Sequence, residues 1–129
     1  MSSKRATDFS PLALAYLGDG VYELFVRSRI LHENENLPAY ALHKAAVRYV
    51  SAAAQSRSIA AIEDRLTERE LSVYKRGRNA KSPTVPKNAD VGDYRRATGF
   101  EALLGYLYIE GENERLEELR GAAFDAAGK

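Results

Sequence analysis

The chain has 129 residues and a formal net charge of +1, and it is 45% hydrophobic and 29% charged. This size and composition are typical of one globular domain with its own core. The absence of cysteine excludes disulfides, thiolate metal sites and cysteine nucleophiles. No apolar run approaches the roughly 20 residues that a membrane span needs, and the N-terminus lacks the apolar core of a signal peptide. We therefore expect a single cytoplasmic domain over residues 1–129, with residues 1–8 flexible and no membrane partner.

The first predicted helix begins after Ser10, a good N-cap that is followed by proline at the first helical position, and runs to about Leu31. Apolar residues almost encircle this segment, which indicates a central helix. Gly18 and Gly20 each cost about 1 kcal/mol in a helix interior. We therefore expect another backbone or a ligand to approach closely at both glycines.

The remainder of the chain also favours helices. Helical patterns cover about 37–56 and 59–66, and the capping box of Thr67 and Glu70 begins a further helix that ends near Gly77. A long loop of about 78–92 follows, and Asp93 is the predicted cap of a helix that ends near residue 110. A last amphipathic helix covers 112–126. No strand is predicted, so we expect an all-α fold.

Two carboxylates, Asp19 and Glu101, lie within the apolar helical runs of this sequence. Burial of an unpartnered acid costs several kcal/mol, so each needs a cation, a proton or a function. Antiparallel packing of their helices would bring them together, and Glu23, one turn after Asp19, would share its face. At about 4 Å two such charges repel by roughly 4 kcal/mol at an effective dielectric constant near 20, and a divalent ion reverses that repulsion. Oxygen ligands without cysteine favour Mg²⁺ or Mn²⁺.

A purely structural reading of the two acids is also open. Each carboxylate can form an ion pair with an arginine and so fix the register of neighbouring helices. Spacing alone favours this reading over a metal site. The candidate partners are Arg27, Arg95 and Arg96.

Positive charge is concentrated in one segment of the chain. Seven basic residues lie between Lys75 and Arg96, against two acids. Their donors suit phosphate oxygens, and the loop has no aromatic residue that could stack on an unpaired base, which favours a duplex ligand. A solvated basic loop that binds nothing is an equally weighted alternative. The candidate RNA-binding residues are Lys44, Arg76, Arg78, Asn79, Lys81, Ser82 and Lys87.

Short segments spread along the chain together resemble a known family. Residues 17–21 are similar to the end of the ribonuclease III signature, and residues 100–105 are similar to the second acidic motif of that family. More specifically, residues 14–19, 42–44, 76–82 and 85–88 resemble the Mini-III ribonucleases, which consist of a catalytic domain without a double-stranded-RNA-binding domain. The resemblance covers about Phe9 to Leu119.

The resemblance implies the helical bundle of the ribonuclease III endonuclease domain and an endoribonuclease that depends on Mg²⁺, with Mn²⁺ as a substitute. Such an enzyme would hydrolyse double-stranded RNA, leave 5′-phosphate ends and mature the ends of 23S ribosomal RNA. Asp19 would hold the metal and orient water, and Glu101 would be the second ligand. The family also implies a homodimer, a ribosomal protein as helper, and a cytoplasmic or chloroplast-stromal location. Tyr16 is the expected dimer contact, and core packing is its alternative role.

The sequence departs from the larger members of the family at two positions. They carry a glutamate where this chain has Ala15 and an aspartate where it has Thr98. These losses leave open a non-catalytic ribonuclease III fold that binds RNA or belongs to the ribosome, although such a protein would be expected to lose Asp19 and Glu101 as well. A helical protein-interaction domain would leave the two acids and the basic loop unexplained.

Overall fold

A computed structural model describes residues 5–81 and 85–128 of the chain. Within these ranges every regular element is helical, so the predicted all-α class is confirmed. No helix in the same ranges combines the length and the apolar character that a membrane crossing requires. The elements are α1 (Pro11–Glu33), α2 (Ala39–Val50), α3 (Ala52–Ile62), α4 (Glu68–Asn79), α5 (Val91–Ile109) and α6 (Asn113–Ala127), with 3-10 turns at Ala6–Asp8 and Glu63–Arg65.

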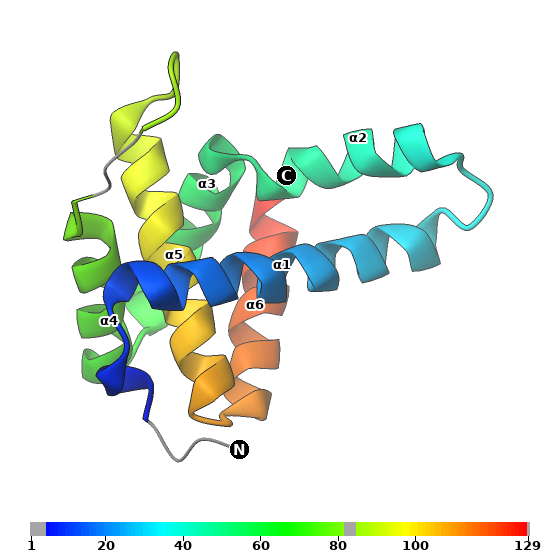
Figure 1. Ribbon diagram of the computed structural model, residues 1–129. Helices are drawn as coiled ribbons and strands as arrows, with labels where there is room; N and C mark the ends of the chain where they lie inside the picture. The colour runs from blue at the N-terminus through cyan, green and yellow to red at the C-terminus, as the bar shows by residue number, and fades with distance from the viewer. Residues whose placement is uncertain (1–4, 82–84, 129) are drawn as a thin grey trace.

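Helix α5 forms the centre of the molecule. Phe100, Leu103, Leu104 and Leu107 on this helix have no exposed side-chain surface. The helices α1, α3, α4 and α6 pack around it, and α2 extends from the body beside the second half of α1 (Figure 1). Helix α1 crosses α5 instead of lying antiparallel to it, so the antiparallel arrangement considered from the sequence is wrong (Figure 1).

Glycines permit the close crossing of α1 and α5. A Cβ atom on Gly18 would collide with the carbonyl oxygen of Glu101, and one on Gly105 would collide with the carbonyl oxygen of Leu14. The close approach predicted at Gly18 is therefore confirmed. At Gly20 the expected approach of another backbone is wrong, because no other segment of the described chain lies within 4 Å of a Cβ built there. The approach of a ligand at Gly20 stays a prediction.

The helix predicted over 37–56 is divided in two at Ser51. The backbone of Ser51 is extended, with φ −62° and ψ 155°, and the Oγ of Ser51 accepts a hydrogen bond from the backbone N of Ala54 at 3.2 Å. A serine that caps a new helix thus ends the previous one. The alanines on both sides favour helix in either arrangement, so local preference does not mark the break.

Both ends of the basic loop differ from the prediction. The capping box of Thr67 and Glu70 begins α4 as expected, but the helix continues through Arg78 and Asn79. Asp90, instead of Asp93, caps α5, because its Oδ1 accepts from the backbone N of Asp93 at 2.8 Å. The loop is therefore confined to 80–90, of which 82–84 lie outside the described residues.

The N-terminal segment is more structured than predicted. Residues 1–4 lie outside the described part of the chain. The following Ala6–Asp8 turn contains Ala6, which is completely buried in the core. The flexible segment expected over 1–8 is therefore wrong for the residues that form this turn.

Candidate metal centre

The crossing of α1 and α5 brings Asp19 and Glu101 together. Gly18, which contacts the backbone of Glu101, is directly followed by Asp19, so the two carboxylates leave the helices at the same place. The Asp19 carboxylate lies within hydrogen-bonding reach of Glu101. Asp19 is exposed, whereas Glu101 is partly buried. The structure therefore places one acid at the surface and the other behind it.

The surroundings of Glu101 oppose its ionisation. Burial, and next the negative charge of Asp19, raise the pKa of Glu101 from 4.5 to about 8, although a hydrogen bond from Gln55 acts in the opposite direction. The charge of Glu23 adds a smaller increase. Without a cation, the carboxyl of Glu101 therefore retains its proton at neutral pH.

Two of the three arginines proposed as structural partners of the two acids bind elsewhere. Arg27 forms an ion pair with Glu23 at 2.9 Å, and Arg96 forms one with Asp93 at 3.0 Å. In residues 5–81 and 85–128, no lysine or arginine forms an ion pair with Asp19 or Glu101. The reading in which arginine pairs fix the register of the helices through these acids is therefore wrong for the described part of the chain.

The acids fit a divalent ion that takes most of its ligands from outside the protein. Two adjacent carboxylates without a neighbouring cation, one of them Glu101 with its raised pKa, suit Mg²⁺, which usually keeps several waters and binds one or two carboxylates. No group of three or more histidine, cysteine, aspartate or glutamate side chains with metal-binding geometry occurs in the residues described. The structure thus does not bring Glu23 into a three-carboxylate group with Asp19 and Glu101.

Sequence reasoning missed one residue of the site. Gln55, on α3, is only 2% exposed, and its Nε2 donates a hydrogen bond to Oε2 of Glu101 at 3.2 Å. A glutamine in an alanine-rich helix carries no motif, and the contact joins residues 46 positions apart in the sequence. Only the tertiary fold reveals it.

The positions that depart from the larger family members do not supply replacement carboxylates. Ala15 is buried, and the Oγ1 of Thr98 donates to the carbonyl oxygen of Tyr94 at 3.0 Å within α5. A threonine hydroxyl used in this way is engaged by its own helix, so it does not supply a ligand to the site.

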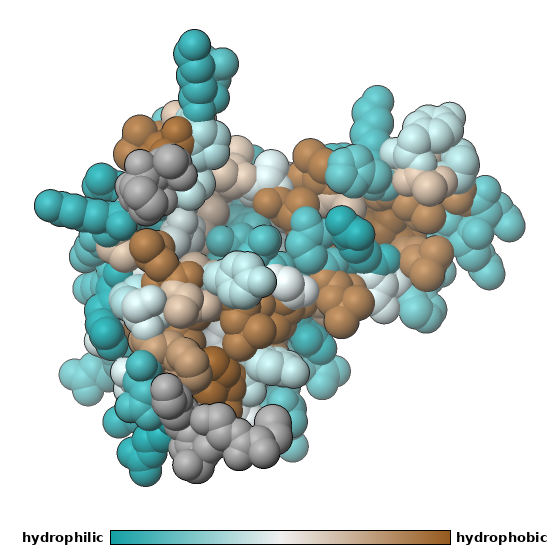
Figure 2. All heavy atoms as spheres, viewed as in Figure 1, coloured by the Kyte–Doolittle hydropathy of each residue, from teal (hydrophilic) through white to brown (hydrophobic). Residues whose placement is uncertain are grey.

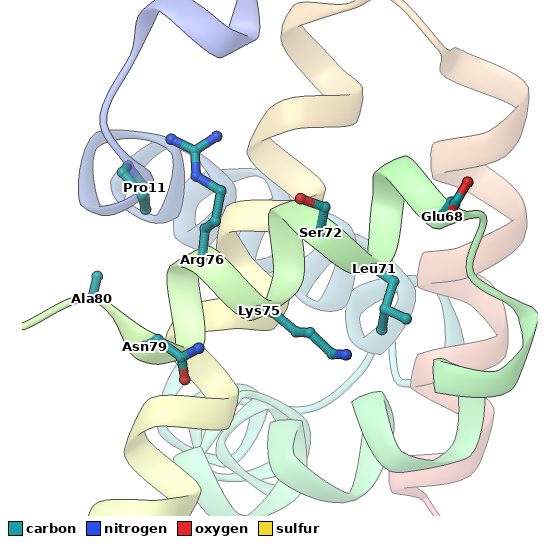
Figure 3. A pocket seen from close by; sticks show the side chains of 8 residues that line it. All are labelled: Pro11, Glu68, Leu71, Ser72, Lys75, Arg76, Asn79 and Ala80. Atoms are coloured by element: carbon teal, nitrogen blue, oxygen red, sulfur yellow. The ribbon is translucent and has the colours of Figure 1, made fainter.

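The predicted RNA-binding residues lie on several elements. Arg76 and Asn79 line an open hollow of about 600 Å³ on α4, and Figure 3 shows Arg76 directed toward Pro11 at the start of α1. Arg78 lies over the ring of Tyr74, 5.6 Å from its centroid, and donates to Asn79 Oδ1 at 3.1 Å. Lys81 and Lys87 are exposed in the loop, Lys44 is exposed on α2, and Ser82 lies outside the described residues.

The loop 80–90 and helix α2 rise on opposite sides of the molecule. Figure 2 shows the surface hollowed between them, on the side toward which α3 lies in Figure 1. Lys81 and Lys87 belong to the loop and Lys44 belongs to α2, so these exposed cations come from separate parts of the chain. The structure does not gather the predicted RNA-binding residues into a single patch.

Large apolar side chains are exposed along α1 and beside it. Tyr16 is 85% exposed, which excludes the core-packing role considered for it. Leu24 and Tyr108 are also exposed and line a shallow hollow with Leu17 and Val21. Figure 2 shows apolar side chains gathered over and beside α1.

Comparisons with known proteins agree on one family. The family model "Ribonuclease III domain" matches residues 12–112. The chain is 52% identical to a Mini-ribonuclease 3 of Clostridium tetani over 110 residues, which cover 85% of this chain and 73% of that protein. It is 51% identical to a Mini-ribonuclease 3 of Brevibacillus brevis over 115 residues, 89% and 85% of the two chains. A crystal structure from Fusobacterium nucleatum matches with a TM-score of 0.82 and 30% identity, covering 92% of this chain and 94% of that one.

Proposed function

Since the chain belongs to the ribonuclease III family, within its Mini-ribonuclease 3 group, we propose that Asp19 and Glu101 bind the Mg²⁺ with which it hydrolyses double-stranded RNA. Membership makes the protein an endoribonuclease that acts on RNA. The metal, the duplex substrate and the two ligands are the finer parts of the proposal, and Mn²⁺ is the expected substitute.

One observation carries this proposal. Two carboxylates meet at a helix crossing that is maintained by glycine, and no basic side chain pairs with them in the part of the chain that the structure describes. Burial, and next the negative charge of Asp19, raise the pKa of Glu101. A divalent ion would remove the repulsion between the two carboxylates and displace the proton of Glu101.

The two acids have different tasks in the proposed reaction. When bound, the metal polarises the phosphoryl oxygens and lowers the pKa of water. Asp19, which is exposed, faces the side from which water and RNA arrive, and its carboxylate can accept a hydrogen bond from the attacking water. Glu101 lies behind it and anchors the site to α5. Attack of water on phosphorus, with departure of the 3′ oxygen, would leave 5′-phosphate and 3′-hydroxyl ends.

The substrate proposed is a duplex stem, and specifically the stem that joins the ends of precursor 23S ribosomal RNA. The exposed cations on two separate segments, Lys44 on α2 and Lys81 and Lys87 in the loop, support contact with the phosphate backbones. A ribosomal protein that presents this stem, and a cytoplasmic location, belong to the same proposal.

A homodimer would supply one catalytic centre for each strand of the duplex. The exposed side chains of Tyr16, Leu24 and Tyr108 support this arrangement, because a monomer gains nothing from exposing large apolar side chains. Leu24 and Tyr108 also line one hollow. Tyr16 is the proposed contact with the second copy.

The experiment is a cleavage assay on end-labelled duplex RNA with Mg²⁺. Asp19→Asn and Glu101→Gln should bind the duplex but not cut it. Glu33→Gln, on the same helix and in an exposed pair with Arg29, should cut like the wild type. Normal cleavage by both site variants would refute the assignment of the ligands. A wild type that binds the stem and never cuts it would support a non-catalytic RNA-binding role, for which the acids missing at positions 15 and 98 are the argument.

A further inference from the structure

Gln55 makes the hydrogen bond that holds the buried acid of the site. Its Nε2 donates to Oε2 of Glu101 at 3.2 Å and to the backbone oxygen of Val50 at 3.0 Å. The Gln55 side chain is 2% exposed, so its two donors are shielded from water and would be costly to leave without acceptors.

The break between α2 and α3 creates this arrangement. In a continuous helix the carbonyl of Val50 would accept from the backbone N of Ala54. Here Ser51 Oγ takes that N–H, and the Val50 carbonyl accepts from Gln55 instead. Both hydrogens of the carboxamide are thus directed at acceptors. A flipped amide would place Oε1 against two oxygens, so the orientation of Gln55 is determined.

A neutral amide suits a carboxylate that must also bind a metal. An arginine or lysine in this place would hold Glu101 equally well, but its positive charge would repel a divalent ion. The amide fixes one oxygen of Glu101 and leaves the full negative charge available. With Oε2 held against α3, the side chain cannot rotate away from Asp19 without breaking a buried hydrogen bond.

The carboxamide oxygen of Gln55, Oε1, differs from Nε2 in its hydrogen bonding. This oxygen is buried and accepts no hydrogen bond from any residue within the described ranges. An unsatisfied buried acceptor costs about 1–3 kcal/mol. Water molecules carried by a hydrated ion are donors of the kind that this atom lacks.

We infer that Gln55 is a positioning residue of the metal site, which holds the Glu101 carboxylate in the orientation that binds the ion beside Asp19. The inference deepens the proposed function and rests on it for the identity of the ion. It assigns to α3, and to the helix break at Ser51, a part in metal binding.

The test measures Mn²⁺ binding by electron paramagnetic resonance, without RNA. Gln55→Met retains the length of the side chain and removes both donors. It should weaken Mn²⁺ binding by about 10- to 100-fold, the range typical of residues that orient a metal ligand. Ser58→Ala is the matched control. Ser58 is buried on the same helix, and this variant removes the hydrogen bond that its Oγ donates to the Ala123 carbonyl at 2.9 Å. It should lower the melting temperature and leave Mn²⁺ affinity unchanged.

Two further measurements separate positioning from a merely structural role. In a Glu101→Gln background, Gln55→Met should cause no additional loss of Mn²⁺ affinity, because it acts through the carboxylate. A higher Mg²⁺ concentration should restore cleavage by Gln55→Met, whereas it would not restore cleavage by a variant that fails to fold. In the wild type, which avoids any folding defect of a variant, Mg²⁺ should shift the nitrogen-15 signal of the Gln55 carboxamide.

The outcomes distinguish this inference from the proposed function. Wild-type Mn²⁺ affinity in Gln55→Met, a further loss in the Glu101→Gln background, or an unmoved carboxamide signal would overturn the inference alone. A wild type that shows the expected Mn²⁺ pattern but does not cut duplex RNA would overturn the proposed function and support the role of Gln55. A wild type that does not bind Mn²⁺ would overturn both.

Discussion

Metal binding at the two acids should depend steeply on pH, because the ion must displace the proton of Glu101. Burial and the neighbouring Asp19 charge raise the pKa of Glu101 to about 8. At pH 7, about one molecule in eleven has this carboxyl ionised, and at pH 6 about one in a hundred. The apparent affinity for Mn²⁺ should therefore increase by about 50-fold from pH 6 to pH 8, with about 0.9 proton released per ion at pH 7.

Isothermal titration calorimetry measures both quantities. Titration of the protein with Mn²⁺ at pH 7, in two buffers that differ in ionisation enthalpy, gives the number of protons released. Glu101→Gln is the control, since it has no proton to lose at this position and should show heats that do not depend on the buffer. Equal affinities at pH 6 and pH 8, together with buffer-independent heats in the wild type, would refute the account of Glu101.

The raised pKa of Glu101 also determines how the stability of the metal-free protein changes with pH. Between pH 4.5, the ordinary pKa of glutamate, and about 8, the folded chain keeps the proton of Glu101 while the unfolded chain has lost it. The unfolded state thus binds fewer protons, so the free energy of unfolding contributed by this group should fall as the pH rises through that window. Saturating Mg²⁺ should abolish the trend, because Glu101 is then ionised in both the folded and the unfolded chain, and thermal denaturation across the window measures it.

Three further predictions concern the crossing, a buried ion pair and the basic loop. Gly18→Ala should lower the free energy of unfolding in urea by about 1–3 kcal/mol because its Cβ meets backbone, whereas Gly20→Ala should raise it by up to about 1 kcal/mol; equal stabilities would contradict the close crossing. Arg115→Met should cost about 3 kcal/mol at pH 7, because it leaves Glu70 buried without its partner at 2.8 Å. The hydrogen bonds from Arg115 lower the pKa of Glu70, so the loss should shrink as acid protonates Glu70, and a loss independent of pH would count against the pair. Lys81→Ala should weaken duplex binding and make its salt dependence shallower by about one unit in a log–log plot, and an unchanged slope would exclude the loop from the interface.

Local chemistry allowed much of the helical framework to be predicted. Ser10 and the Thr67–Glu70 capping box satisfy backbone groups within their own first turns, so their signals are contained in a few consecutive residues. Asp90 and Asp93 are equivalent as caps by residue type, and only the fold decides between them. The prediction therefore placed the start of α5 too late.

The site was predictable only in part, because its members depend on contacts between distant segments. An acid beside glycine in an apolar helix is visible in the sequence, and Asp19 and Glu101 were identified from that pattern. Whether arginines neutralise them depends on where Arg27 and Arg96 point, which spacing does not determine. Gln55 enters the site through a helix break that the alanine-rich sequence around it does not reveal.

Anomalous diffraction from crystals soaked in MnCl₂ above pH 8 tests the central claim most directly. The account predicts a manganese peak within direct coordination distance of both Asp19 and Glu101, with water completing its shell, and a weaker peak at this position in Glu101→Gln crystals. A manganese ion bound elsewhere, with the two carboxylates free of metal in the wild type, would contradict it.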